Sequence, residues 1–150
     1  MKLAEALIER ADIQKRLQEL RIQINGSLQT EEGEKPEESV ESLMKQFEEI
    51  TERMTSLVDR INRTNSQTET DKGTISFLLA KRDAIAQLKN QYQTLAGQSN
   101  PMRYGRTKDD IKFVLTFSPK KMRSKADALA KEHRELDTFV QGLNWTTDLV

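Results

Sequence analysis

Four stretches of this chain place apolar residues alternately three and four positions apart, and this spacing limits the folds open to it. Residues spaced in this way return to one side of an α-helix, so each stretch carries a narrow apolar stripe, called here its seam. The four stretches span about 2–26, 37–64, 74–96 and 119–142. The sequence therefore predicts a mainly α protein with four long helices.

Each seam has seven positions, most of them aliphatic. The four seams are Leu3, Ala6, Arg10, Ile13, Leu17, Leu20 and Ile24; Val40, Leu43, Phe47, Ile50, Met54, Leu57 and Ile61; Ile75, Leu78, Arg82, Ile85, Leu88, Tyr92 and Leu95; and Met122, Ala126, Leu129, His133, Leu136, Val140 and Leu143. Pro36 suits the first turn of the second helix, and Ser118 followed by Pro119 suits the start of the fourth.

The composition indicates how the seams are buried. Charged residues make up 32% of the 150 residues and hydrophobic residues 35%, whereas ordinary globular domains have roughly 45–50% apolar residues. We expect a single domain, 1–150, folded as an elongated antiparallel helical bundle with coiled-coil-like seams. Because long helices with two-position stripes seldom bury them within one copy, we also expect a homo-oligomer.

One short segment departs from the helical period. Over 111–117 a set of four apolar residues, Ile111, Phe113, Leu115 and Phe117, alternates with Lys112, Val114 and Thr116, which predicts a strand. A strand needs a partner for its backbone groups, and two are open: the threonine-rich stretch 66–70, or the same strand of a second subunit. Asp71, Lys72 and Gly73 predict a turn, and Thr74 an N-cap for the third helix.

The charges are unevenly placed although the formal net charge is zero. Residues 31–60 contain ten acids and four bases, and residues 100–125 contain eight bases and two acids. These blocks could meet within a chain, meet between subunits or face water. Nucleic-acid binding is an alternative function for the basic block, although the zero net charge disfavours it. Its candidate residues are Arg103, Arg106, Lys108, Lys120 and Lys121.

The absence of cysteine excludes disulfides, thiolate metal sites and a cysteine nucleophile. Residues 1–5 (MKLAE) lack the apolar region of a signal peptide, and no run approaches the ~18 apolar residues of a membrane span. We therefore expect a cytoplasmic protein with no membrane partner.

Several segments together resemble a family of small bacterial proteins known as septicolysins. They are residues 1–12 (MKLAEALIERAD), 61–65 (INRTN), 80–83 (AKRD) and 144–147 (NWTT). The resemblance covers essentially the whole chain and implies no established biochemical activity. The name suggests a cytolysin, but the chain has neither an export signal nor the alternating apolar hairpins of a membrane-crossing barrel.

Three ionisable residues interrupt the seams. Arg10 and Arg82 need carboxylates nearby if they are buried, and an interhelical ion pair is the favoured interpretation. The alternative is a pocket for a small anionic ligand, or an enzyme site, formed by Arg10, Arg82 and His133 with Asn65. His133, with Asp137 one turn later, could act as a general base, but a core or interface histidine is favoured.

The remaining patterns point away from catalysis. The pairs Glu38/Glu41 and Glu49/Glu52 lie off the seam and lack a Glu-x-x-His partner, so a solvated face is favoured over a metal site. No phosphate-binding loop, dinucleotide fingerprint, nucleophile elbow or zinc spacing occurs. We expect no catalytic residue, cofactor or metal, and a structural or interaction role.

Overall fold

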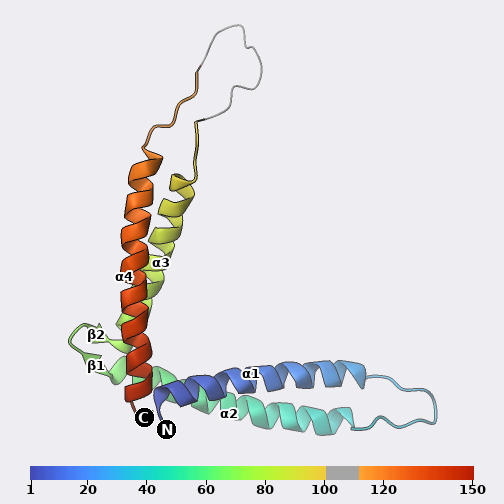
Figure 1. Cartoon of the computed structure of the whole chain (residues 1–150). Coiled ribbons are helices and arrows are strands. Elements are labelled where there is room, and N and C mark those ends of the chain that lie inside the picture. Colours follow the sequence, from blue (N-terminus) through green and yellow to red (C-terminus); the bar gives the residue numbers. More distant parts are fainter. Residues whose placement is uncertain (101–111) are drawn as a thin grey trace. The chain divides into compact units, whose positions relative to one another are not determined.

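The computed structural model describes residues 1–100 and 112–150 and separates the chain into two compact units. The first unit contains Met1–Ser76 and Gln141–Val150, and the second contains Phe77–Val140. The prediction of a mainly helical fold is confirmed: the described residues form four α-helices and one small antiparallel sheet (Figure 1).

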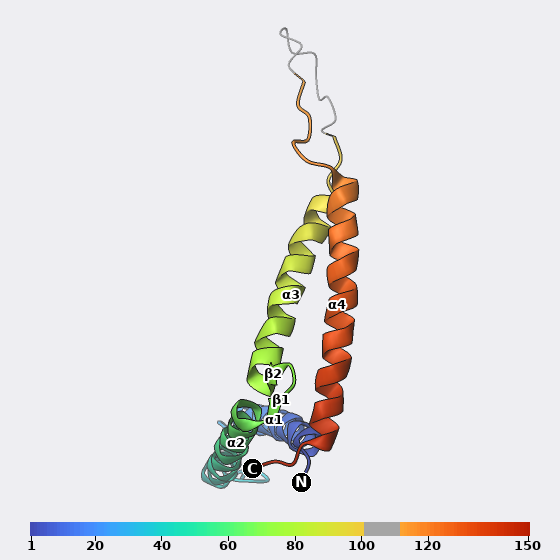
Figure 2. The ribbon, with the colours of Figure 1, turned by 90° about the vertical axis from the view of Figure 1, so that its left-hand side faces the viewer.

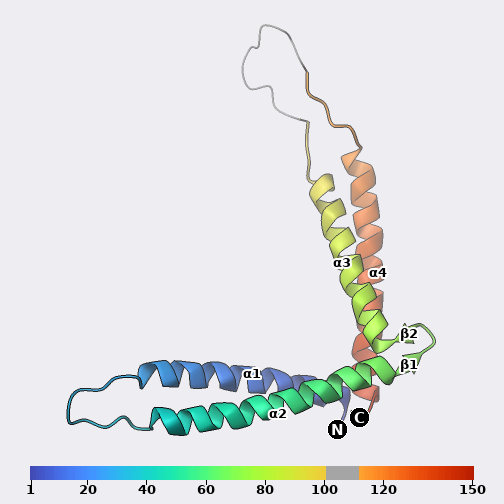
Figure 3. The same ribbon diagram turned by 180° about the vertical axis from the view of Figure 1, so that it is seen from behind.

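The first unit is built on a pair of antiparallel helices, α1 (Leu3–Gly26) and α2 (Val40–Gln67), which lie side by side in Figures 1 and 3. Their seams form the core of this helical hairpin, and seam residues of both helices are buried. Each fully buried leucine or isoleucine contributes about 1.5–3 kcal/mol through removal of its side chain from water. The buried seam residues away from the chain ends are Ile13, Leu20, Leu43, Leu57 and Ile61.

The start of α2 differs from the prediction. The helix begins at Val40, and the Ser39 hydroxyl accepts a hydrogen bond from the backbone N–H of Ser42 at 3.1 Å. Ser39 is therefore the N-cap, and Pro36 lies in the preceding loop, outside the helix. A serine that satisfies a free N–H group defines the helix start more strongly than a proline that is only tolerated there.

The small sheet consists of β1 (Glu69–Thr70) and β2 (Gly73–Thr74), joined by a turn at Asp71 and Lys72. The Thr70 hydroxyl donates to the Gly73 carbonyl at 2.7 Å and accepts from the Lys72 N–H at 3.1 Å. Gly73 has φ of 110°, a conformation that glycine adopts without steric cost. The predicted turn is confirmed.

The strand predicted at 111–117 is wrong for residues 112–117, which form neither strand nor helix; Ile111 lies outside the described residues. Alternation supplies one apolar face but no partner for the backbone groups. The threonine-rich stretch does contribute a strand, but β1 pairs with β2 and not with residues 112–117.

The C-terminal residues of the first unit join its N-terminus. Leu3 N–H donates to the Thr147 carbonyl and Leu149 N–H to the Met1 carbonyl, both at 2.9 Å. Lys2 Nζ lies 2.8 Å from the Asp148 carboxylate. The hydrogen bond from Lys2, together with its charge, holds the pKa of Asp148 below the ordinary value of 3.8.

The C-terminal residues also contact the end of α2. Val150 N–H donates to the Thr64 hydroxyl at 3.0 Å, and Arg60 Nε donates to the Val150 carbonyl at 2.9 Å. Thr64 is fully buried and also donates to the Arg60 carbonyl, so its hydroxyl group is satisfied twice. Residues from both ends of the sequence therefore complete the first unit.

The second unit contains most of α3 (Ile75–Ala96) and α4 (Pro119–Thr146), which lie side by side in Figures 1 and 2. As predicted, α4 begins at Pro119, and the Ser118 hydroxyl accepts from Lys121 N–H at 3.3 Å. The first turns of α4 contact the C-terminal end of α3: Arg123 donates to the Ala96 carbonyl at 3.3 Å, and Lys125 Nζ lies 5.4 Å from the centroid of the Tyr92 ring.

The predicted seams are the covered sides of the helices. All seam residues lie in the described ranges, and Leu88 is the only one of them that is exposed. The α4 helix continues to Thr146, beyond the predicted end near residue 142. None of the helices in residues 1–100 and 112–150 is long and apolar enough to cross a lipid bilayer.

Candidate interaction surface

The two edges of the α1–α2 hairpin differ in chemistry, and one of them is ionic. Arg53 of α2 forms a salt bridge with Glu9 of α1. Further along, Arg16 of α1 donates to the Gln46 side chain at 3.5 Å, and Gln46 donates in turn to the Glu38 carboxylate. Polar side chains therefore pair across the two helices along this edge, called here the ionic edge.

The opposite edge is apolar. In an α-helix each residue is rotated by about 100° from the last, which places Phe47, Met54 and Val58 on the side of α2 away from Gln46 and Arg53. The same rotation places Leu17 and Ile24 of α1 on this side. These five residues are all half-buried, whereas Leu20 and Leu43 between the helices are fully buried. We call this side the apolar edge.

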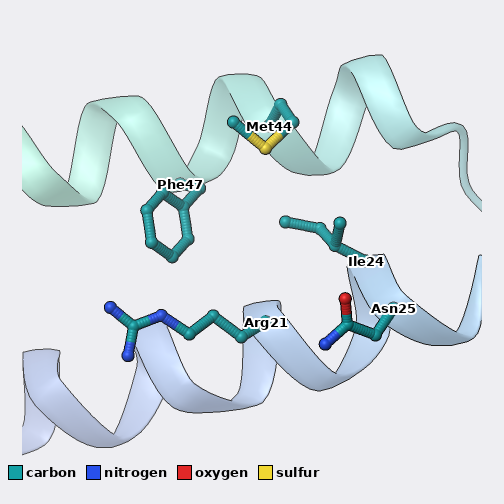
Figure 4. A pocket seen from close by; sticks show the side chains of 5 residues that line it. All are labelled: Arg21, Ile24, Asn25, Met44 and Phe47. Atoms are coloured by element: carbon teal, nitrogen blue, oxygen red, sulfur yellow. The ribbon is translucent and has the colours of Figure 1, made fainter.

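A shallow hollow of about 230 Å³ lies at the loop end of the apolar edge (Figure 4). The lining residues come from both helices and leave an apolar floor with polar groups only on the α1 side: Arg21, Ile24, Asn25, Met44 and Phe47. The Arg21 guanidinium lies 5.6 Å from the centroid of the Phe47 ring, a cation–π distance.

On the α2 side two exposed acids and one exposed base, Lys45, lie close to Met44, so the surface beside the hollow is net acidic. Met44, which is 38% exposed, has Glu41 three positions before it and Glu48 four positions after it. Both glutamates are exposed and lie on the same face of α2 as Met44. The loop that precedes α2 adds further acids. An apolar floor beside a negative face suits a partner that is apolar and positively charged.

The predicted arginine and histidine residues fall in different units: Arg10 belongs to the first, and Arg82 and His133 belong to the second. Arg82 Nη1 lies 2.9 Å from Asp137 Oδ1, so the α3 arginine is paired with an α4 carboxylate. Asp137, which the sequence suggested as a partner for His133, therefore pairs with Arg82. His133 is half-buried on α4.

The other two ligand-binding candidates lie in the first unit. Arg10 is half-buried, and its Nε is buried without a hydrogen-bond partner among the described residues. Asn65 is half-buried in the last turn of α2. Because α2 continues to Gln67, Asn65 lies within the helix and does not cap it.

Of the five candidate nucleic-acid-binding residues, two lie within the described residues. Arg103, Arg106 and Lys108 lie outside the described residues. Lys120 and Lys121 are exposed in the first turn of α4. That turn is the positive end of the helix dipole, so two lysines there raise the local positive potential.

Part of the hollow lies outside the predicted seams. Phe47 and Ile24 are seam residues, whereas Met44, Arg21 and Asn25 are not. The available signal was an apolar residue directly after a seam position, with a glutamate one turn away on either side. Within residues 1–100 and 112–150, no group of three or more histidine, aspartate or glutamate side chains is arranged to hold a metal ion.

Comparison with known proteins gives a family but no activity. The chain is similar to a protein of known crystal structure, described as a functionally unknown conserved protein from Corynebacterium diphtheriae, with 41% identity and a TM-score of 0.89. The alignment covers 100% of this chain and 99% of that one. No curated protein matches.

The family assignment corrects the resemblance drawn from short segments. The model of a family of unknown function, DUF6847, matches residues 10–149, and neither this match nor the similar crystal structure points to septicolysin. Short segments such as 80–83 are poor guides because helical surfaces of unrelated proteins share the same few residue types. The chain belongs to the family of unknown function DUF6847.

Proposed function

We propose that this protein acts as an interaction module that self-associates, with another copy covering the apolar edge of the α1–α2 hairpin. The observation that carries the proposal is the row of half-buried apolar residues along that edge, from Ile24 and Phe47 to Met54 and Val58. Exposed apolar side chains scattered singly need no explanation, but a continuous row along one side indicates a contact surface.

The geometry of two helices explains why the row stays open. A seam residue in a pair of helices contacts one neighbour, whereas in a four-helix bundle it is enclosed from both sides. Leu20 and Leu43 are fully buried between α1 and α2, but Phe47 and Met54 lie beside that contact and keep part of their surface in water. A further helix or segment along the apolar edge would remove this surface from water.

The difference between the two edges supports a defined orientation. The ionic edge has paired its charges within the hairpin, as in Arg53 with Glu9. The apolar edge has no comparable pairs in the described contacts, and the buried Arg10 Nε is without an acceptor among the described residues.

The proposal is tested by sedimentation velocity of the whole chain at micromolar concentration, together with a Met44→Gln/Met54→Gln double variant. Glutamine has nearly the same helix propensity as methionine, so the helix should persist, as circular dichroism would show. We expect an oligomer for the unaltered chain and a loss of at least about tenfold in self-affinity for the variant, since each methionine contributes on the order of 1.5–3 kcal/mol when buried.

The matched control is Glu49→Gln, on the exposed outer face of the same helix. It should leave the oligomer unchanged. A monomer at every concentration tested would refute self-association, and an oligomer unaffected by the double variant would place the contact elsewhere.

A further inference from the structure

Residues 112–117 (KFVLTF) present apolar side chains that the second unit does not cover. They form neither helix nor strand, and Phe113 and Val114 are 75% and 71% exposed. Adjacent exposed apolar side chains lower the solubility of a protein. They are typical of a surface that is buried when a partner binds.

Positive charge surrounds this segment. Residues 112–125 contain five bases and no acid. All five bases are exposed, and two of them, Arg123 and Lys125, also contact the end of α3. The segment is therefore both apolar and basic, which is the chemistry that suits the hollow between α1 and α2.

We propose that residues 112–117 of one copy dock into the hollow lined by Ile24, Met44 and Phe47 of a second copy, with Phe113 on the apolar floor. This inference rests on the self-association proposed above and names the segment that makes the contact. The charges agree with it, because Lys112 would lie beside Glu41 and Glu48, which flank Met44.

The size of the hollow favours a side chain as its occupant. Small-molecule sites usually enclose roughly 300–1,000 Å³, and this hollow is smaller, at about 230 Å³, and open. Arg21 lies over one face of Phe47 and would meet the Phe113 ring as a second aromatic surface. The attraction between Lys112 and the glutamates beside the hollow would speed the association of the two copies and orient the docked segment. The apolar contact would supply most of the affinity.

The absence of cysteine from the chain allows a direct test. Met44→Cys and Val114→Cys are prepared as separate full-length proteins, mixed, and treated with a short bifunctional thiol cross-linker. Docking brings the two thiols to a high effective concentration, so we expect cross-linked heterodimer at least about tenfold faster than for unassociated chains. The matched control mixes Val114→Cys with Ser56→Cys, an exposed site on the other side of α2.

The outcomes separate the two proposals. If the chain sediments as a monomer, self-association fails and this inference fails with it. If it sediments as an oligomer but the Met44/Val114 mixture reacts no faster than the Ser56 control, self-association stands and the docking of residues 112–117 is refuted. A chain carrying both cysteines that cross-links only within itself would also refute docking between copies.

A second variant tests the contact without cross-linking. Phe113→Ser alters an exposed side chain outside the helices, so the helical content should be unchanged. We expect weaker self-association, by at least about tenfold because a buried aromatic anchor commonly contributes 2 kcal/mol or more. An unchanged association constant would contradict the inference.

Discussion

Arg82 of α3 and Asp137 of α4 form a salt bridge, with Nη1 and Oδ1 2.9 Å apart. The two side chains are 27% and 41% exposed, so the pair is only partly shielded from water. Asp83 lies further away, at 3.7 Å from Arg82 Nε. The arginine in the α3 seam is thus compensated chiefly by the facing helix, and the pair joins α3 to α4 at a defined register.

A double-mutant cycle with Arg82→Met and Asp137→Asn measures the strength of this pair. We expect a coupling of about 0.5–1 kcal/mol in the free energy of unfolding, since water screens a half-exposed pair. Urea unfolding of the four proteins gives the value. The control is a cycle on Lys131 and Glu135, an exposed pair at 3.9 Å, for which we expect less than about 0.5 kcal/mol. Equal couplings would contradict a register role for Arg82.

Shortening a buried seam residue of the hairpin should destabilise the first unit. Leu20→Ala removes a fully buried side chain and leaves a cavity, so we expect a loss of about 2–5 kcal/mol in the free energy of unfolding. The comparison is Ile22→Ala, two positions later on the same helix, where the side chain is 64% exposed. Its effect should stay below about 1 kcal/mol. Similar losses at both positions, in urea unfolding, would show that the seam is not the core.

The N-cap of α2 can be tested independently of the core. Ser39→Ala removes the acceptor of the Ser42 N–H and should cost about 1 kcal/mol. Ser56→Ala, in the exposed middle of the same helix, should be neutral or slightly stabilising because alanine favours a helix interior. Thermal unfolding of both variants distinguishes a cap at Ser39 from a helix that begins at Pro36.

The contact between Lys2 and Asp148 predicts a pH dependence. The pKa of Asp148 is lowered in the folded state, so its ionised carboxylate stabilises the fold. This contribution to the free energy of unfolding is complete above the unfolded-state pKa and is lost as the pH falls through the folded-state pKa. The stability difference between the unaltered chain and Asp148→Asn should therefore be greatest above about pH 4 and should vanish in stronger acid.

Carbon NMR of the Asp148 carboxyl group measures the shift directly. Its pKa should lie below 3.8 in the unaltered chain and move towards 3.8 in Lys2→Ala, because Lys2 is the main cause of the shift. A pKa that does not respond to the loss of Lys2 would contradict the contact.

The helices follow from local spacing, and so they were predictable. Seam positions such as Leu20, Leu43 and Leu136 repeat every three or four residues, and any helix made from them buries the same side. The turn before Gly73 and the start of α4 at Pro119 were also predictable, because the turn needs a residue that adopts positive φ, as glycine does, and the helix start suits the fixed φ of proline.

Contacts between distant residues were not predictable in the same way. The sequence favoured an interhelical ion pair for Arg82, but it did not identify the partner, Asp137, which lies 55 positions further along. The strand predicted at 111–117 fails over 112–117 because an alternating pattern specifies a face but not a partner. The hollow beside Met44 exists only because α1 and α2 align in one register.

By itself, the sequence determined the number of helices, their covered faces and most of their ends, because these depend on interactions within a turn or two. The tertiary structure decided which charges pair, that the small sheet lies at Glu69–Thr70 and Gly73–Thr74, and that residues near both termini meet through Lys2 and Asp148. Such contacts depend on how whole helices align, and many alignments satisfy the same local pattern equally well.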